Sequence, residues 1–223
     1  AVLQALTAQE ISQVMKYCNE RHIAVTPRGA GTGLCGGCVA KDGGVILSTE
    51  KMKKVIEVDA KNMTATVEPG VLLMEFPKSL EGTGLFYPPD PGEKTATMGG
   101  NAMTNAGGMR AVRYGVTRDY VLGMEVVLPT GEILHLGGKN VKTSSGYSLI
   151  NLMIGSEGTL GFLTQLTVKL IPEPKTNVSL LIPFADLDAC IEAVPEVLRC
   201  GCEPTAVEFM EREVITSAET YLG

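Results

Sequence analysis

The stretch Pro27-Arg-Gly-Ala-Gly-Thr-Gly-Leu-Cys-Gly-Gly37 decides how the chain is interpreted. It follows the short apolar run 23–26, for which a strand is predicted. Its glycines allow left-handed backbone conformations, so that successive N–H groups can turn toward one concavity. A diphosphate fits such a concavity, whereas the alternative interpretation is a glycine-rich surface turn.

The same stretch contains a misleading pattern. Residues 31–36 match G-x-G-x-x-G, and Glu57 lies near the spacing at which dinucleotide-binding folds place a ribose-binding acid. That fingerprint must open a helix, yet residues 37–44 contain three further glycines and no helical periodicity. We therefore reject a Rossmann fold.

Two further motifs carry clustered polar and glycine residues. Tyr87–Gly92 is proline-rich and leads into 95–108, where two Gly pairs allow close approach to a flat or charged ligand. Neutral hydrogen-bonding side chains recur there at Thr95, Thr97, Asn101, Thr104 and Asn105, as a flavin ring or a diphosphate would require. An ordered structural loop is the alternative.

The third motif is Gly155–Gly161, which lies between a predicted short helix and a predicted strand. Glu157 is its one acid. Its carboxylate either accepts a hydrogen bond from a ribose hydroxyl or is a solvated group in a helix C-terminal turn, and the sequence leaves both open.

Composition excludes several classes of protein. The 223 residues are 44% hydrophobic, which is sufficient for a buried core. With 19 basic and 25 acidic residues and no basic tract, nucleic acid is not an expected partner. No apolar run approaches the roughly 20 residues that cross a bilayer, so no transmembrane segment is expected. The six cysteines lack the context of a small secreted domain, which favours a cytoplasmic location.

Periodicity and turn residues predict a mixed α+β chain. Thr7-Ala-Gln-Glu10 has the form of a capping box, and Pro77 predicts a kink or a later start for the helix in which it lies. We predict helices near 8–21, 71–81, 148–154 and 185–198, strands at 23–26, 45–48, 54–58, 63–67, 164–170 and 178–182, and a hairpin over 123–136. A domain boundary is expected at Pro172–Pro174, which separates domain 1–172 from domain 173–223.

The three motifs together resemble those of FAD-linked oxidases of the vanillyl-alcohol oxidase superfamily, which have a PCMH-type FAD-binding domain. Within it, the likeness is to the group of the glycolate oxidase FAD subunit, the D-lactate dehydrogenases and the D-2-hydroxyglutarate dehydrogenases. The resemblance rests on PRGAGTGLCGG, on YPPDPG with GGNAMTNAGG and RYGVTRDYVLG, and on GSEGTLGFLTQLTVKL, and it covers essentially the whole chain. It implies two α+β subdomains that bind FAD between them, followed by the start of an α+β substrate (cap) domain.

The resemblance also assigns cofactor-binding residues. It implies that the diphosphate is wrapped by Pro27, Arg28, Gly29, Ala30, Gly31, Thr32, Gly33 and Leu34. It implies that the middle of the cofactor and its ring are lined by Pro89, Gly99, Gly100, Asn101, Thr104, Asn105, Gly107, Gly108 and Gly115, and that Glu157 and Gly161 lie by the adenosine end or the diphosphate. Relatives that attach FAD covalently in the first loop have a histidine at the position of Thr32, so FAD is expected to be non-covalent.

The family's histidine-rich segment, which supplies the base and a carboxylate clamp, has no counterpart here. The two histidines, His22 and His135, lie outside any matching motif, so we expect them to be structural or exposed. The catalytic residues are therefore unknown, and we interpret the sequence as a fragment.

The cysteine pairs Cys35/Cys38 and Cys200/Cys202 are candidate zinc or iron–sulfur ligands. Their spacings do not form a standard set, and the first pair lies in the flavin loop, so no metal site is predicted. A redox-active Cys35/Cys38 pair remains an alternative.

The predicted function is FAD-dependent oxidation of a 2-hydroxy acid, such as glycolate or D-lactate, to the 2-oxo acid. Hydride passes to flavin N5, and the electrons pass to a partner such as an iron–sulfur subunit or an electron-transferring flavoprotein. The alternatives are a FAD-carrying electron-transfer subunit without its own substrate and a nicotinamide-dependent dehydrogenase.

Overall fold

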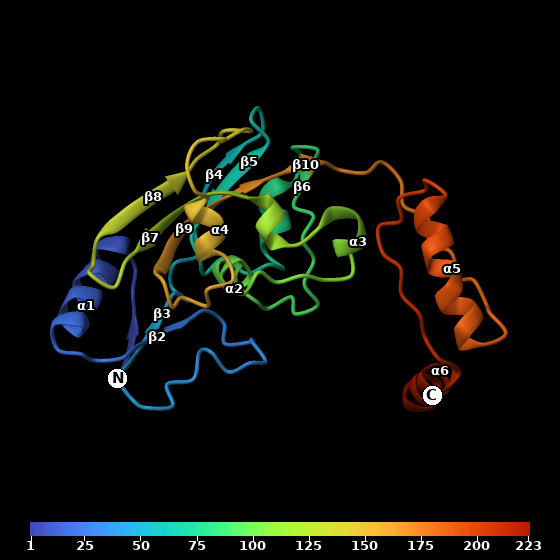
Figure 1. The fold of residues 1–223 in the computed structure, drawn as a ribbon, viewed down its shortest axis with the longest axis horizontal. Coiled ribbons are helices and arrows are strands. Elements are labelled where there is room, and N and C mark those ends of the chain that lie inside the picture. Colours follow the sequence, from blue (N-terminus) through green and yellow to red (C-terminus); the bar gives the residue numbers. More distant parts are fainter.

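Two β-sheets form the framework of the computed structural model, which describes residues 1–223 (Figure 1). The smaller sheet has the order β1-β3-β2, and all its strands are parallel. Its strands are β1 (Val2–Gln4), β2 (Val25–Arg28) and β3 (Val45–Ser48). Adjacent parallel strands need a crossover of a dozen or more residues. Residues 29–44, which contain most of the glycine-rich stretch, are the crossover from β2 to β3.

The larger sheet is antiparallel, with the order β4-β5-β9-β7-β8. Its central strand β9 has seven buried or half-buried residues before the exposed Lys169, because both faces of the sheet are covered. Its strands are β4 (Val55–Asp59), β5 (Thr64–Val67), β7 (Val121–Val127), β8 (Ile133–Gly137) and β9 (Phe162–Lys169). A two-stranded pair joins β6 (Leu85–Phe86) to β10 (Ile171–Pro172).

Short helices connect and cover the sheets. The helix α1 (Ala8–Glu20) packs against β7, and its N-cap Thr7 accepts a hydrogen bond from the Glu10 amide at 3.2 Å. The Glu10 carboxylate reaches back one residue further than a capping box does, to the Leu6 amide at 2.8 Å. The other helices are η1 (Phe76–Leu80), α2 (Met98–Thr104), α3 (Ala111–Tyr114), η2 (Thr117–Tyr120), α4 (Leu149–Met153), α5 (Leu187–Arg199) and α6 (Arg212–Leu222).

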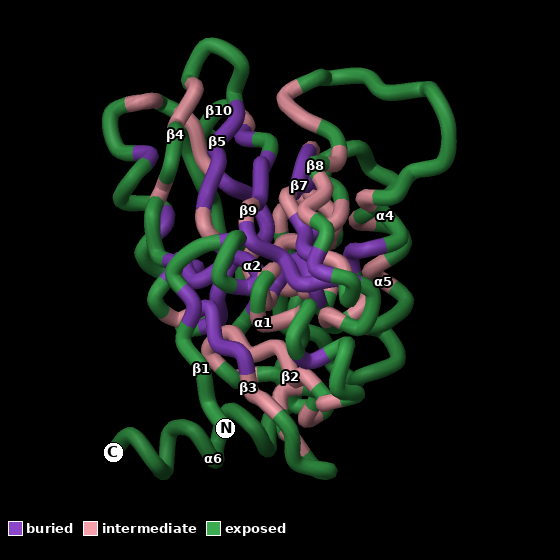
Figure 2. The backbone as a smooth tube through the Cα atoms, turned by 90° about the vertical axis from the view of Figure 1, so that its left-hand side faces the viewer, coloured by how far each residue is buried: buried purple, intermediate pink, exposed green.

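Two hydrophobic clusters hold these layers together, and their positions are visible as the buried stretches of the central strands (Figure 2). The larger cluster lies between the five-stranded sheet and α2, with Met98, Leu166 and Phe76 at its centre. The smaller one joins Ile11 of α1 and Leu47 of β3 to one end of the larger sheet, at Val127 and Phe162. The two sheets are therefore fixed relative to each other.

Residues after Pro172 are organised differently. None of them is buried, and α5 and α6 lie to one side of the sheets (Figure 1). An ion pair between Arg113 and Glu203, at 3.8 Å, connects this segment to the rest. The arrangement is that of a mixed α/β body followed by a helical segment that contributes no buried residue to it.

Most of the predicted elements are confirmed, with changed bounds. The strand predicted at 23–26 lies at 25–28 and continues through Pro27, which is possible because β2 is an edge strand. The helix predicted over 71–81 is reduced to η1, whose start beside Pro77 agrees with the later start that this proline predicted.

The strand predicted at 178–182 is wrong. A strand needs a neighbour that takes up its N–H and C=O groups, and no extended segment of the 223 residues pairs with it. Its apolar side chains are therefore exposed, with Leu181 at 88%. The elements β1, β6, β10, α2, α3, η2 and α6 were not predicted; two consecutive glycines in α2 conceal its helical pattern.

Candidate cofactor site

A cleft lies where the three glycine-rich motifs meet, between the β2–β3 crossover and α2. The end of β2 contributes Pro27 and Arg28, and the crossover contributes Gly29, Ala30, Gly31, Thr32, Gly33, Gly37 and Cys38. The region of α2 contributes Ala96, Thr97, Gly99, Gly100, Asn101, Met103 and Thr104. The third motif and β9 contribute Glu157, Gly158, Gly161, Phe162 and Leu163, and Thr49 and Pro69 complete the lining.

Glycine is required where these segments touch. A Cβ atom at Gly29 would stand 2.5 Å from the Thr97 hydroxyl, and one at Gly37 would stand 2.5 Å from the Glu157 carboxylate. A Cβ at Gly158 would stand 2.6 Å from the Pro27 ring. Segments separated by more than sixty residues in the sequence therefore approach closely and form one wall.

The crossover presents a row of free hydrogen-bond donors. No backbone amide from Gly29 to Cys38 donates a hydrogen bond within the chain. Gly31 and Gly36 have φ angles of 77° and 75°. These angles lie in the left-handed region, which residues other than glycine rarely adopt. Free amides in such a loop can bind the oxygens of a diphosphate.

The helix α2 contributes to the cleft in another way. Its N-terminal amides already have partners: Met98 N–H donates to Val71 O at 2.8 Å, and Gly99 N–H donates to Pro69 O at 2.9 Å. The Thr97 hydroxyl caps the helix by accepting from Gly100 N–H at 3.1 Å. What α2 offers a ligand is therefore its side chains and the flat surface of its glycines.

One of these side chains lacks a partner. The Asn101 residue is 4% exposed, and its Nδ2 has no hydrogen-bond acceptor in the chain. An amide donor buried without a partner costs about 1–3 kcal/mol. Because Asn101 lines the cleft, a bound molecule with an acceptor at this point would remove that cost.

The charge in the cleft is sparse. Only Arg28 and Glu157 among the lining residues are charged at neutral pH. The Arg28 guanidinium lies under Gly31, donates to the Cys38 sulfur at 3.6 Å and forms no ion pair. A positive group without a carboxylate partner, beside free amides, suits an anionic group such as a diphosphate.

The third motif holds Glu157 in position through the backbone. The Glu157 amide donates to Met103 O at 2.8 Å, and the Gly155 amide donates to Ala102 O at 3.2 Å. Glu157 itself has a φ of 54°, in the left-handed region. Of the two interpretations left open, the structure directs the carboxylate to the cleft wall beside Gly37, although the residue stays exposed.

The structure brings thirteen of the nineteen predicted cofactor residues into the cleft lining, and their role in binding stays a prediction. Six lie outside it. Leu34 is fully exposed and Pro89 is buried, while Asn105 ends α2 with a φ of 49° and accepts from the Arg118 amide at 3.0 Å. The remaining three are Gly107, Gly108 and Gly115.

These three glycines have local structural roles. A Cβ at Gly108 would collide with the Asp90 carbonyl oxygen, and one at Gly107 would stand 3.0 Å from a Val116 methyl group. Gly115 has a φ of 77° and lies against the Asp119 carboxylate. Close approach to the chain's own atoms is therefore sufficient to explain why glycine is needed at these three positions, without a ligand.

Ten lining residues were not among the nineteen assigned to the cofactor. Gly37, Cys38 and Thr97 lie within the motifs and were accessible to sequence analysis. Ala96, Met103 and Gly158 also lie within the motifs, and Phe162 and Leu163 directly follow the third one. No local signal marks Thr49 and Pro69, which reach the cleft through the packing of distant segments.

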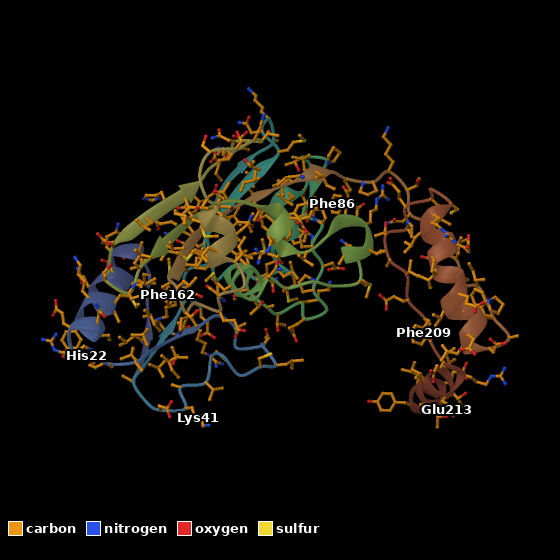
Figure 3. All side chains as sticks on the ribbon, in the orientation of Figure 1. His22, Lys41, Phe86, Phe162, Phe209 and Glu213 are labelled. Carbon is orange, nitrogen blue, oxygen red and sulfur yellow. The ribbon has the colours of Figure 1, made fainter.

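Other candidate groups lie outside the cleft. His22 is at the outer end of α1, as Figure 3 shows, and the His135 ring lies 3.5 Å from the Glu125 carboxylate on the exposed side of β8. Glu57 accepts a hydrogen bond from Lys139 at 2.7 Å. All six cysteines are free thiols, and no group of three or more His, Cys, Asp or Glu residues is arranged to hold a metal ion.

Comparison with known proteins defines the class. Residues 1–137 match the family described as FAD binding domain, and residues 173–223 match the family of FAD linked oxidases, C-terminal domain. The chain belongs to the FAD-binding domain family. None of its helices combines the length and apolar character needed to cross a bilayer.

Particular relatives are similar over nearly the whole chain. A D-lactate dehydrogenase of Anaerostipes hadrus is 55% identical over 100% of this chain and 47% of its own length. The glycolate oxidase subunit GlcD of Bacillus subtilis is 43% identical over 99% of this chain and 47% of its own length. A D-2-hydroxyglutarate dehydrogenase of Xanthomonas citri is 43% identical over 81% of this chain and 39% of its own length. The chain thus spans about half the length of the curated relatives it matches.

A solved structure shares the fold. One structure of alkyldihydroxyacetonephosphate synthase aligns with a TM-score of 0.69 and 26% identity, covering 78% of this chain and 34% of that one.

Proposed function

We propose that the protein oxidises a 2-hydroxy acid to the 2-oxo acid with FAD as the electron acceptor. The free amides of residues 29–38, in a cleft that also contains Arg28 and the unpartnered Asn101 amide, are the observation that supports it. The identity of 43–55% to a glycolate oxidase subunit and to a D-lactate dehydrogenase favours this substrate class.

We assign different residues of the cleft to different parts of the cofactor. The crossover amides and Arg28 hold the diphosphate, and Asn101 and Thr104 hold the more polar part of the cofactor beyond it. When bound, FAD supplies the acceptor for the hydride of the substrate α-carbon. The chain's own residues orient the cofactor, and Phe162 and Leu163 shield it from water.

The cleft does not contain a suitable general base. Its ionisable side chains are Arg28, Cys38 and Glu157. The Glu157 carboxylate lies against Gly37 of the crossover, on the side proposed for the diphosphate and not for the substrate. We therefore place the base and the carboxylate clamp in the second domain, which we propose begins at residue 173 and of which residues 173–223 are the start. An electron acceptor, such as an iron–sulfur subunit or an electron-transferring flavoprotein, then reoxidises the flavin.

We also place FAD in a non-covalent complex. Thr32 lines the cleft, no histidine does, and a threonine hydroxyl does not form the bond that a histidine ring forms with the flavin. Acid denaturation of the yellow protein should release the colour to the supernatant; colour that remains in the pellet would show a covalent link.

Anaerobic reduction tests the function. Full-length protein and residues 1–223, both loaded with FAD, are mixed with D-lactate, glycolate or D-2-hydroxyglutarate, with dithionite as a control that each flavin is reducible. We expect one acid to bleach the full-length flavin and none to bleach that of residues 1–223. Bleaching by 1–223 would place the base within this chain. If none of the acids reduces the flavin of the full-length protein and only a protein partner does, the protein is instead an electron-transfer subunit.

A further inference from the structure

Two free thiols lie near the middle of the crossover, one of them in the cleft lining. Cys35 is exposed and Cys38 is half-buried, and neither is paired. Gly36 and Gly37 lie between them, and Gly37 and Cys38 line the cleft whereas Cys35 does not. The sequence therefore places a C-x-x-C dithiol at the edge of the site where the flavin diphosphate is proposed to bind.

The backbone around this dithiol is free to rearrange. No amide from Gly29 to Cys38 donates within the chain, and the one hydrogen bond that closes the turn is Val39 N–H to Gly36 O at 2.9 Å. Gly36 has a φ of 75°, and a Cβ there would meet no atom within 4 Å. A disulfide needs Cα atoms about 4.4–6.8 Å apart. The two glycines between the cysteines widen the range of backbone conformations through which the chain can reach that separation.

Oxidation would change the cleft itself. The Cys38 sulfur now accepts from the Arg28 guanidinium at 3.6 Å, and a bond to Cys35 would turn it away. Gly37 lies close against the Glu157 carboxylate, so a shift of the 36–38 turn also moves this wall. Arg28 is the one cationic side chain of the cleft, and its guanidinium contacts this turn through the Cys38 sulfur.

We infer that Cys35 and Cys38 form a redox-modifiable dithiol whose oxidation to a disulfide weakens FAD binding. The inference rests on FAD binding in this cleft and is independent of which acid the protein oxidises.

The oxidant is a small-molecule disulfide such as oxidised glutathione. The exposed Cys35 sulfur, as thiolate, attacks one sulfur of the reagent, and the S–S bond of the reagent breaks to release one glutathione thiolate. The Cys38 sulfur then attacks Cys35, forming the intramolecular S–S bond and releasing the second glutathione. The two electrons and the two thiol protons of the dithiol end on the two glutathione molecules.

The test measures FAD affinity against thiol state. The 223-residue chain carrying Cys200→Ser and Cys202→Ser, which removes the other cysteine pair, is equilibrated with reduced or oxidised glutathione. Its FAD dissociation constant is measured by flavin fluorescence, and the oxidised cysteines are mapped by mass spectrometry of peptides. We expect a Cys35–Cys38 disulfide, two hydrogen atoms lighter than the dithiol, and an FAD dissociation constant raised at least about tenfold. Dithiothreitol should restore both.

The matched control is Cys35→Ser, which removes the disulfide without altering a residue of the cleft lining. This variant should bind FAD as the reduced protein does, in either buffer. A loss of affinity on oxidation of Cys35→Ser, an absent Cys35–Cys38 disulfide, or equal affinities of the dithiol and disulfide forms would each overturn the inference. Failure of the reduced chain to bind FAD would instead refute the proposed function, and the inference with it.

Discussion

Gly31 shows how one residue serves both the backbone and the cleft. Its φ of 77° lies in the left-handed region, and a side chain there would displace the Arg28 guanidinium. A residue other than glycine in this conformation costs about 1–2 kcal/mol. The position therefore combines a conformational requirement with a requirement for space beside the proposed diphosphate.

We predict that Gly31→Val loses FAD, with affinity reduced at least about a hundredfold, because both the strain and the displaced Arg28 act against binding. Gly36→Val is the matched control, since Gly36 has nearly the same φ but lies outside the cleft in open space. Flavin retention on gel filtration measures the outcome. Equal loss in both variants would show that loop strain, and not the cleft, is responsible.

Asn101 offers a test in which stability and binding change in opposite directions. Replacing Asn101 by Leu removes a buried amide donor that has no partner, so we predict an apoprotein more stable by about 1 kcal/mol. The same change should weaken FAD binding about tenfold or more, because the donor that the cofactor would use is gone. Urea unfolding of the apoprotein and FAD titration give the two values.

Thr64→Val is the control for Asn101. The Thr64 hydroxyl on β5 is likewise buried without a partner, but it lies outside the cleft. This variant should be stabilised without a change in FAD affinity. If Asn101→Leu leaves FAD affinity equally unchanged, the Asn101 amide does not bind the cofactor.

At the scale of elements, the β4–β5 turn has a measurable pH signature. Asp59 accepts from the Asn62 side chain at 2.7 Å and from Lys139 at 2.9 Å. These hydrogen bonds, that from Asn62 first, hold the pKa of Asp59 well below its ordinary value. A depressed folded pKa contributes stability that is present above about pH 4 and is lost as pH falls through the folded pKa.

We predict that Asn62→Ala raises the pKa of Asp59, so that stability falls less steeply below about pH 4 than in the unaltered chain. Carboxyl-carbon NMR titration measures the pKa directly. Asn177→Ala, at an exposed position far along the chain, should leave it unchanged. An unaltered Asp59 titration in Asn62→Ala would assign the low pKa to Lys139 and the backbone instead.

At the scale of the whole molecule, residues 1–170 contain all the buried residues, whereas residues 171–223 contain none. The exposed Arg113–Glu203 pair is of a kind worth about 0–1 kcal/mol. Glu173 donates its amide to Gly84 O at 2.9 Å, so the first domain uses the chain to that point.

We predict that a chain ending at residue 175 has a free energy of unfolding within about 1 kcal/mol of that of the 223-residue chain. It should also bind FAD with equal affinity. Urea unfolding followed by tyrosine fluorescence, together with FAD titration, provides the comparison. A stability loss above about 2 kcal/mol would show that residues 176–223 pack on the first domain more than their exposure indicates.

Local patterns located most of the elements, and the exceptions have physical causes. The helix α1 follows from its cap and one apolar face, and β7 and β8 follow from the turn at Pro129–Gly131. The short helix α2 escaped because its glycines carry no periodicity, while its stability comes from Met98 and Ala102 in the core. The predicted strand 178–182 failed because pairing is a property of two segments, and one segment cannot indicate its partner.

The sequence alone determined that three glycine-rich motifs, through their resemblance to known ones, belong to a FAD-binding domain, because the residue types themselves show where the backbone is free to approach a ligand. Only the tertiary structure decided which of those residues share a cleft. It brings Gly29 beside Thr97 and Gly37 beside Glu157, and it separates Gly108 and Gly115 from the cleft lining. The reason is that a glycine serves close approach of any kind, and whether the approaching group is a ligand or the chain's own backbone depends on how distant strands pack.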